Sequence, residues 1–337
     1  MSIPSFELTR PTTIAEACAQ LADPTQRAEV IAGGTQLLVA MKNQTRLPRR
    51  LVDLGGIHGL DAIRYGASEG LTIGARVTLA HLADHPDVRH HYPAISEAAL
   101  AVGTPQLQSM GTVAGNLCQD ACCLYVDRAV GQRQALTPCH KVDGDLCHVV
   151  AGSALCWANY AGDVAPVLIA LGASMTVASP AGEQARPLAA LFSGDGKRPI
   201  ALVPGELVTA IRVPAPPPRS GATYLKLRQR QSLDYPLLGV AAAVVLAEDG
   251  TCRSASLVLT GVDRGPVVVE QAASLAGQAL TGPQLEAVAR AAYRQARPVK
   301  NAFGYGPSYR VKMITPYVLR ALGGAIARAE GREASRG

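Results

Sequence analysis

The sequence predicts an α+β protein in which two subdomains make up a first domain and a separate α+β domain with an antiparallel sheet follows. Three observations carry this prediction. An apolar strand, a glycine turn and a helix follow one another within residues 1–57, and helical and strand patterns mix through residues 58–216. A proline-rich linker, Pro214–Pro218, then precedes alternating strands in residues 217–337. Consecutive prolines join neither a helix interior nor a central strand, so we expect the chain to divide there.

The first region reads as a small α/β unit. A threonine suited to N-capping begins a segment with helical spacing of apolar residues, and two short apolar strands flank a glycine turn and a second helix. In chain order, the predicted elements are helix Thr13–Leu21, strand Glu29–Ala32, turn Gly33–Thr35, helix Gln36–Lys42 and strand Arg50–Leu54.

The second region combines apolar helices with short strands. Helical patterns are assigned by spacing, and strands by alternation or by short β-branched runs. The predicted helices are Leu79–Ala83, Ala94–Val102 and Val164–Leu171, and the predicted strands are Leu71–Ala75, Ser174–Ala178 and Glu206–Pro214.

The third region begins with strands and ends with helices, the order typical of an α+β domain. Its predicted strands are Thr223–Arg230, Leu237–Ala247 and Ser254–Thr260, and its predicted helices are Leu285–Arg294 and Tyr309–Ile326.

Composition excludes several classes of function. Net charge is +6, but the basic residues are scattered and aromatic residues make up only 4%, too few for a base-stacking platform, so no nucleic acid is expected. The longest apolar run, Leu237–Ala247, is too short to span a bilayer. Met1–Arg10 lacks the basic and apolar segments of a secretory signal. We therefore expect a soluble, cytoplasmic protein with no membrane contact.

Cysteines gather in one stretch of the chain. Six of the eight lie between Cys118 and Cys156, whereas Cys18 and Cys252 stand alone. Disulfides would need an oxidising compartment, and a cytosolic cluster of cysteines more often binds metal. Thiolates select Zn²⁺, Cu(I) or iron–sulfur clusters. The stretch thus indicates a metal or electron-transfer site rather than a hydrolytic one.

Two glycine turns could each cradle a phosphate group. Gly33-Gly34-Thr35 lies between a strand and a helix, and Gly111–Asn116 precedes the cysteines. Glycine allows backbone N–H groups to approach a phosphate closely, and a helix N-terminus favours negative charge. Neither turn has the Walker or GxGxxG pattern. Each could be a plain connecting turn, but two cradles together suit a dinucleotide.

Four segments carry a family resemblance: AGGTQLL, TIGARVTLAHL, GTVAGN and GDVAP. Together with YLKLRQRQSLDYPLLGVAAAV in the third region, they resemble the FAD-binding subunit of molybdenum hydroxylases, the family of xanthine dehydrogenase and carbon monoxide dehydrogenase. The resemblance runs from about residue 5 to residue 325. The cysteine insert, at about 117–160, resembles that of the 4-hydroxybenzoyl-CoA reductase β subunit, which carries an extra [4Fe–4S] cluster.

The resemblance implies the fold of that family's two-subdomain FAD-binding domain, and it implies flavin contacts residue by residue. The first turn would cradle the FAD pyrophosphate with Val30, Ile31, Ala32, Gly33, Gly34, Thr35, Gln36 and Leu37. The second cradle would be Thr112, Val113, Ala114, Gly115 and Asn116. Further cofactor contacts would come from Val102, Tyr125, Asp163, Val208 and Lys226. The family usually has aspartate at the position of Gln36, which puts the role of that residue in question.

The same resemblance implies a ligand set for the cluster. Cys123, Cys139, Cys147 and Cys156 match the four ligands, and Leu124-Tyr125 favours Cys123 over the adjacent Cys122 as the first ligand. A structural zinc site is the alternative, since it also takes four thiolates, although no short CxxC spacing is present. His140 and His148 are loop residues that could also approach a metal. Trp157 is expected to shield the cluster from solvent.

As a function, the resemblance implies a flavin and iron–sulfur electron-transfer subunit of a molybdenum oxidoreductase. Reductive dehydroxylation of an aromatic acyl-CoA is the first reading, with electrons entering from a ferredoxin-like carrier at the cluster. The alternatives are a hydroxylase subunit with outward electron flow and a zinc-stabilised FAD-binding subunit without a redox path. Implied partners are a molybdopterin-binding large subunit and a small [2Fe–2S] subunit, arranged as a dimer of heterotrimers.

Overall fold

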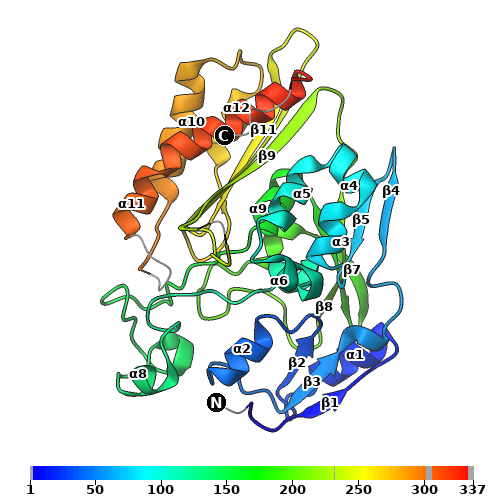
Figure 1. Ribbon diagram of the computed structural model, residues 1–337, viewed down its shortest axis with the longest axis vertical. Helices are drawn as coiled ribbons and strands as arrows, with labels where there is room; N and C mark the ends of the chain where they lie inside the picture. The colour runs from blue at the N-terminus through cyan, green and yellow to red at the C-terminus, as the bar shows by residue number, and fades with distance from the viewer. Residues whose placement is uncertain (1–2, 231, 301–305, 333–337) are drawn as a thin grey trace.

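Three β-sheets follow one another along the chain in the computed structural model of the protein (Figure 1). The structure describes residues 3–230, 232–300 and 306–332. The Pro214–Pro218 stretch lies between the second and third sheets. Helices and one antiparallel sheet make up the described part of the C-terminal region, as the α+β prediction requires.

The first sheet is parallel and has the order β1-β3-β2. Its strands are β1 (Glu7–Thr9), β2 (Ala28–Ile31) and β3 (Arg50–Asp53). Helix α1 (Ile14–Ala22) starts at a capping box, in which Thr13 and Glu16 each accept from the other's backbone N–H. Helix α2 (Leu37–Lys42) follows the Gly33–Thr35 turn, and the short helix η1 (Leu54–Gly56) follows β3.

The second sheet is antiparallel and has the order β4-β5-β8-β6-β7. Its strands are β4 (Ile63–Gly66), β5 (Gly70–Gly74), β6 (Ser174–Ser179), β7 (Gly182–Pro187) and β8 (Leu207–Val213). The accompanying helices are α3 (Leu79–Asp84), α4 (Pro86–His91), α5 (Pro93–Leu100), α6 (Pro105–Met110), α7 (Val113–Leu117), α8 (Val130–Gln134), η2 (His140–Val142), α9 (Val164–Ala170) and η3 (Leu188–Leu191).

The third sheet is antiparallel and has the order β12-β11-β10-β9. Its strands are β9 (Ser220–Leu227), β10 (Leu238–Leu246), β11 (Cys252–Thr260) and β12 (Val267–Val268). Its helices are η4 (Glu270–Leu275), α10 (Gly282–Gln295), α11 (Pro307–Lys312) and α12 (Ile314–Ala329). Helix α12 packs on β9 and β10, and α10 packs on α12, so the sheet is covered on one face (Figure 1).

Most predicted elements occur within two or three residues of their expected bounds. The predicted helix Tyr309–Ile326 is two helices, α11 and α12, which meet at Met313. The short strands β1, β4, β7 and β12 were not predicted. Three of them have a largely exposed or mixed burial pattern, so the period-2 hydrophobic signal is weak there.

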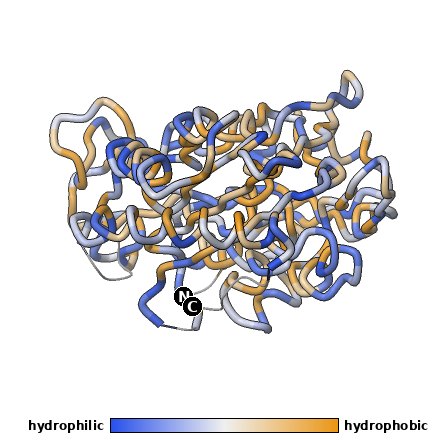
Figure 2. Tube along the Cα trace, turned by 90° about the horizontal axis from the view of Figure 1, so that it is seen from above, coloured by the Kyte–Doolittle hydropathy of each residue, from blue (hydrophilic) through white to orange (hydrophobic). Residues whose placement is uncertain are grey.

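Hydrophobic residues form a continuous interior across the second and third sheets. The core between β5, β6, β8 and helices α3, α5 and α9 extends to Tyr224 of β9, Ala241 of β10 and Val258 of β11. Figure 2 shows hydrophobic segments running through the middle of the molecule and hydrophilic loops at its edge. In the described part of the chain, no helix combines the length and the apolar character needed to cross a membrane.

Candidate functional site

An open cleft lies where the three regions of the chain meet. The first glycine turn, the segment from α5 to α7, the start of α9 and a loop of the third region all contribute to its walls. The lining residues are Thr35, Gln36, Leu79, Val102, Gly103, Leu107, Gly111, Thr112, Gly115, Asn116, Gln119, Ala161, Asp163, Leu233, Asp234 and Tyr235.

The first glycine turn offers unused backbone donors to this cleft. No hydrogen bond among the described residues uses the N–H groups of Gly33, Gly34, Thr35 or Gln36. Gly34 has a φ of +68°, which favours glycine. A Cβ on Gly33 would collide with the carbonyl group of Met110, so the turn can approach this segment only as glycine. Free N–H groups beside a cleft can bind the oxygens of a phosphate.

The second glycine turn differs, because most of its backbone donors are already occupied. The N–H groups of Val113 and Ala114 donate to Val77 and Ala75, and the N–H of Gly115 donates to Thr112 Oγ1. The phosphate cradle at this turn therefore stays a prediction, with fewer free backbone donors than the first turn offers. Thr112, Gly115 and Asn116 still line the cleft. They lie at the N-terminus of α7, where the N-cap residue Thr112 accepts from the N–H of Gly115.

A buried ionic group forms one wall of the cleft. Asp163 accepts from Tyr224 Oη at 2.7 Å and from Lys226 Nζ at 3.1 Å, and Lys226 also donates to the carbonyl oxygen of Ala101. Burial raises the pKa of Asp163 and lowers that of Lys226, while their mutual attraction opposes both shifts. Tyr224 and Lys226 are on β9, so the third region completes this wall.

The cleft passes a simple test of fit for FAD. Gln119 lines it and is 7% exposed, and its amide Nε2 meets no acceptor at hydrogen-bonding geometry within the described residues. A buried donor without a partner is costly, and a polar ligand in the cleft would satisfy it. Together with the free N–H groups of the first turn, it gives the cleft donors for phosphate and ring oxygens.

Some predicted flavin contacts line the cleft and others do not. Thr35, Gln36, Val102, Thr112, Gly115, Asn116 and Asp163 line it. Lys226 lies behind Asp163. Val208, in β8, is 2% exposed and belongs to the hydrophobic core instead. The predicted residues that are also absent from the lining are Val30, Ile31, Ala32, Gly33, Gly34, Leu37, Val113, Ala114 and Tyr125.

Sequence reasoning missed several lining residues. Leu233, Asp234 and Tyr235 come from the third region, although they lie within the RQSLDYP stretch that carried part of the resemblance. Gln119 lies between Cys118 and Cys122, shortly after the second glycine turn. These residues follow no helical or strand periodicity. The only sequence signal for them is their position within or beside the recognised motifs.

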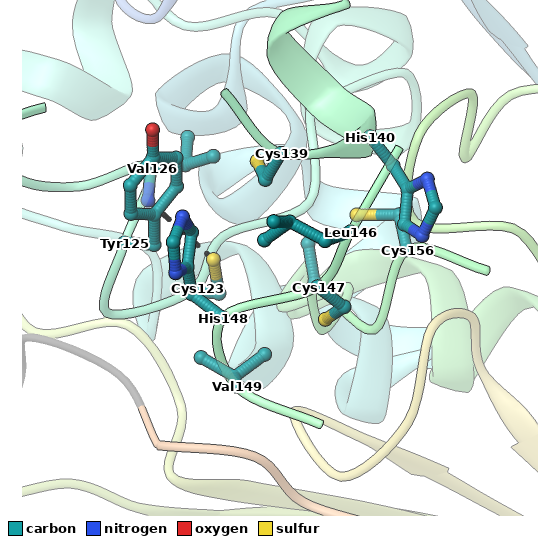
Figure 3. Close-up of a pocket in the computed structure, with 11 residues that line it drawn as sticks. Cys123, Tyr125, Val126, Cys139, His140, Leu146, Cys147, His148, Val149 and Cys156 are labelled. Atoms are coloured by element: carbon teal, nitrogen blue, oxygen red, sulfur yellow. Dashed lines mark hydrogen bonds between the residues drawn. The ribbon is translucent and has the colours of Figure 1, made fainter. Parts of the chain in front are cut away.

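The four cysteines assigned as ligands line one cavity (Figure 3). Cys123, Cys139 and Cys156 are buried and Cys147 is half-buried. Burial raises the pKa of the Cys123 thiol to about 12 and also raises that of Cys156. All eight cysteines of the chain are free thiols. Tyr125 also lines this cavity, where its ring stacks on His148.

A tight turn brings Cys139 and Cys147 to the same cavity. Cys139 pairs with Leu146 in a β-bridge, and Gly144 donates to the Cys139 carbonyl oxygen. A Cβ on Gly144 would collide with the carbonyl group of Pro138, so this turn requires glycine. His140 and His148 each donate from Nε2 to a backbone carbonyl oxygen, of Ser153 and Thr137 respectively.

The neighbouring cysteines have other surroundings. Neither Cys118 nor Cys122 lines the cavity. Cys122 instead forms a β-bridge with Asn159, and its thiol points toward the Asp120 carbonyl oxygen at 3.9 Å. Trp157 is half-buried, donates to Ser153 Oγ and lies under the guanidinium of Arg264.

No group of three or more His, Cys, Asp and Glu side chains in the described residues is arranged to hold a metal ion. Four cysteine donors are a set that a zinc ion and a [4Fe–4S] cluster both take, so the lining alone does not separate these two alternatives.

Two family models together match most of the chain. Residues 4–216 match the FAD binding domain in molybdopterin dehydrogenase, and residues 223–325 match the CO dehydrogenase flavoprotein C-terminal domain.

Individual proteins show the same likeness. The chain is 37% identical to the aldehyde oxidoreductase FAD-binding subunit PaoB of Escherichia coli (strain K12), over 80% of this chain and 85% of PaoB. It is 33% identical to the carbon monoxide dehydrogenase medium chain of Afipia carboxidovorans, over 97% and 98% of the two chains. A solved carbon monoxide dehydrogenase from Hydrogenophaga pseudoflava contains a chain with a TM-score of 0.79 and 27% identity, covering 97% of this chain and 99% of that one.

Proposed function

The chain belongs to the FAD-binding medium subunits of the molybdenum hydroxylase family, and from this premise we propose that it is the flavin and iron–sulfur electron-transfer subunit of a molybdenum-containing dehydrogenase. The observation that carries the iron–sulfur part is the single cavity lined by four cysteines. It lies close in sequence to the flavin cleft, since Gln119 lines the cleft and Cys123 lines the cavity.

The cleft described above is where we propose that FAD binds. Unused N–H groups of Gly33 to Gln36 support a pyrophosphate position at the first turn. When bound, FAD exchanges one or two electrons and so links one-electron carriers to a two-electron reaction. The protein's own part is to hold the cofactor: Asp163 orders Tyr224 and Lys226 at one wall, and apolar Val102 and Leu107 restrict water at another.

The cysteine cavity is the proposed site of a [4Fe–4S] cluster with Cys123, Cys139, Cys147 and Cys156 as ligands. Its support is the number and type of the donors and their burial. The raised thiol pKa values of Cys123 and Cys156 imply that these two sulfurs stay protonated until a metal replaces the proton.

The names of the relatives favour outward electron flow, from the substrate on the molybdopterin subunit through this chain to an external acceptor. PaoB is named as part of an aldehyde oxidoreductase, and the medium chains as parts of carbon monoxide dehydrogenases. We therefore propose oxidation of a small substrate such as an aldehyde on a separate molybdopterin subunit. The resemblance of the insert to 4-hydroxybenzoyl-CoA reductase is not supported by these relatives, and reductive dehydroxylation becomes the competing outcome of the test.

The proposed partners follow the family. A molybdopterin-binding large subunit and a small [2Fe–2S] subunit would complete the complex, with a ferredoxin-like carrier at the cluster. The dimer of heterotrimers and the cytoplasmic location are parts of the same proposal.

One experiment tests the function directly. The complex is purified and its FAD, iron and molybdenum are counted, and then aldehydes and aromatic acyl-CoA thioesters are assayed with oxidised and reduced one-electron carriers. Aldehyde-dependent reduction of an acceptor is expected. Turnover of the thioester with a reduced donor, and none of aldehyde, would replace the dehydrogenase proposal with the reductase.

A cysteine pair tests the ligand set. Cys123→Ser should lose the [4Fe–4S] EPR signal of the reduced protein, because a ligand is missing, while the control Cys122→Ser should keep it. Loss of the signal in Cys122→Ser alone would refute the assignment, and zinc in place of iron would refute the cluster itself.

A further inference from the structure

We propose that Lys141 and Asp120 are a positioning pair that ties the cysteine loop to the first flavin turn, so that filling one cofactor site strengthens binding at the other. The inference rests on the proposed function, because it takes the cleft as the flavin site and the cavity as the cluster site. It adds an energetic link between the two sites, carried by residues of this chain.

The pair connects segments that are far apart in the sequence. Lys141 Nζ donates to Asp120 Oδ1 at 2.6 Å and to the carbonyl oxygen of Gly196 at 2.6 Å. The backbone N–H of Asp120 donates to Gln36 Oε1 at 2.8 Å. Gln36 lines the flavin cleft, as Tyr235 does. An unbroken set of hydrogen bonds thus runs from Lys141 to the cleft.

The same pair also holds two of the cysteine-bearing segments together. Asp120 precedes Cys123 by three residues, and Lys141 follows Cys139 by two. The Lys141 side chain is 8% exposed and that of Asp120 is 23% exposed. Breaking a buried pair leaves an uncompensated charge, so the two segments keep a fixed separation while the pair is intact.

Coupling follows from this geometry. A cluster fixes Cys123 and Cys139, and thereby fixes Asp120 against Gln36. FAD fixes Gln36, and thereby fixes Asp120 and the loop behind it. Since linkage between two binding sites is reciprocal, each cofactor should raise the affinity for the other by the same factor.

The test measures FAD affinity in the purified complex after flavin removal, with the cluster present and after its removal. In the wild-type protein the Kd for FAD should be about tenfold lower with the cluster than without it, a coupling of ordinary size. In Lys141→Met the two values should differ by less than about twofold. The control is Lys197→Met, which removes a long and exposed ion pair. The Lys197 side chain is 39% exposed, and its Nζ lies 3.9 Å from Oδ1 of the exposed Asp143. This control should behave as the wild type.

Hydrogen exchange provides a second readout that needs no cluster. Adding FAD to cluster-free protein should slow amide exchange in residues 139–147 of the wild type and of Lys197→Met, and not of Lys141→Met. If Lys141→Met fails to fold, the double variant Asp120→Asn/Lys141→Met removes both charges and leaves neither buried alone. It should show the same loss of coupling.

Two results would overturn the inference. One is a Kd for FAD in the wild type that does not depend on the cluster, and the other is a full tenfold dependence in Lys141→Met. If the purified protein contains no iron, the cluster proposal fails by itself, and the exchange measurement alone decides whether the loop and the flavin turn are coupled.

Discussion

Gly33 illustrates how one residue shapes the flavin cleft. Its missing side chain allows the first turn to lie against the carbonyl group of Met110, at the end of α6. Residues on both sides of this contact line the cleft, Thr35 on one and Gly111 on the other. The distance between these two segments therefore depends on a position where any Cβ would clash.

We predict that Gly33→Ala lowers flavin content and destabilises the protein by about 1–3 kcal/mol, the usual cost of forcing extra atoms into a packed contact. Absorbance of bound flavin and thermal unfolding measure the two effects. The control is Gly131→Ala in α8, where an added Cβ meets no atom within 4 Å. A Gly33→Ala protein with full flavin content would show that the turn does not have to stay where the structure places it.

At the scale of elements, α12 and β9 meet closely at one of two adjacent glycines. Gly323 is exposed and has open space around its missing Cβ, whereas a Cβ on Gly324 would lie 2.9 Å from Cγ2 of Thr223. Thr223 is buried on β9, and its hydroxyl donates to the carbonyl oxygen of Ala321 at 2.8 Å. One glycine thus serves packing, and the other only weakens the helix.

The two substitutions should have opposite effects on stability. Gly323→Ala should stabilise the protein by about 0.5–1 kcal/mol, the difference in helix propensity. Gly324→Ala should destabilise it, because Thr223 must shift and its bond to α12 weakens. Chemical denaturation of both variants gives the comparison. A stabilised Gly324→Ala would mean that β9 and α12 can separate slightly at no cost.

At the scale of the whole molecule, the third region is attached to the second by contacts at β9. Arg328 of α12 forms an ion pair with Glu97 of α5 and donates to the carbonyl oxygen of Ala222. Glu97 also accepts from the backbone N–H of Tyr224. Since β9 carries Tyr224 and Lys226 to Asp163, this attachment helps to set one wall of the cleft.

We predict that Glu97→Gln destabilises the protein by about 1 kcal/mol and speeds FAD dissociation several-fold, because the partly buried ion pair and the register of β9 both weaken. Stopped-flow flavin release and denaturation measure these changes. Glu286→Gln removes the exposed pair with Arg290 on α10 and should change neither by more than about 0.5 kcal/mol. Equal effects of the two variants would contradict a role for the Glu97 contact in the cleft.

Much of the fold could be predicted because its signals are local. The capping box at Thr13, the apolar period of α9 and α10 and the runs of β10 and β11 each depend on neighbours in the sequence. The break between α11 and α12 carries no such signal, since no proline or glycine stands at Met313. The short edge strands depend on partners elsewhere in the chain.

By itself, the sequence determined the order of elements and the family resemblance, because periodicity and glycine turns are properties of short segments. Only the tertiary structure decided which glycine turn keeps more free donors. In the second turn, the N–H groups of Val113 and Ala114 donate to the carbonyl groups of Val77 and Ala75, which the fold brings to them. The structure also brought Tyr235 to the cleft and placed Val208 in the core. Hydrogen bonding and burial are decided by neighbours in space, and spacing along the chain does not specify them.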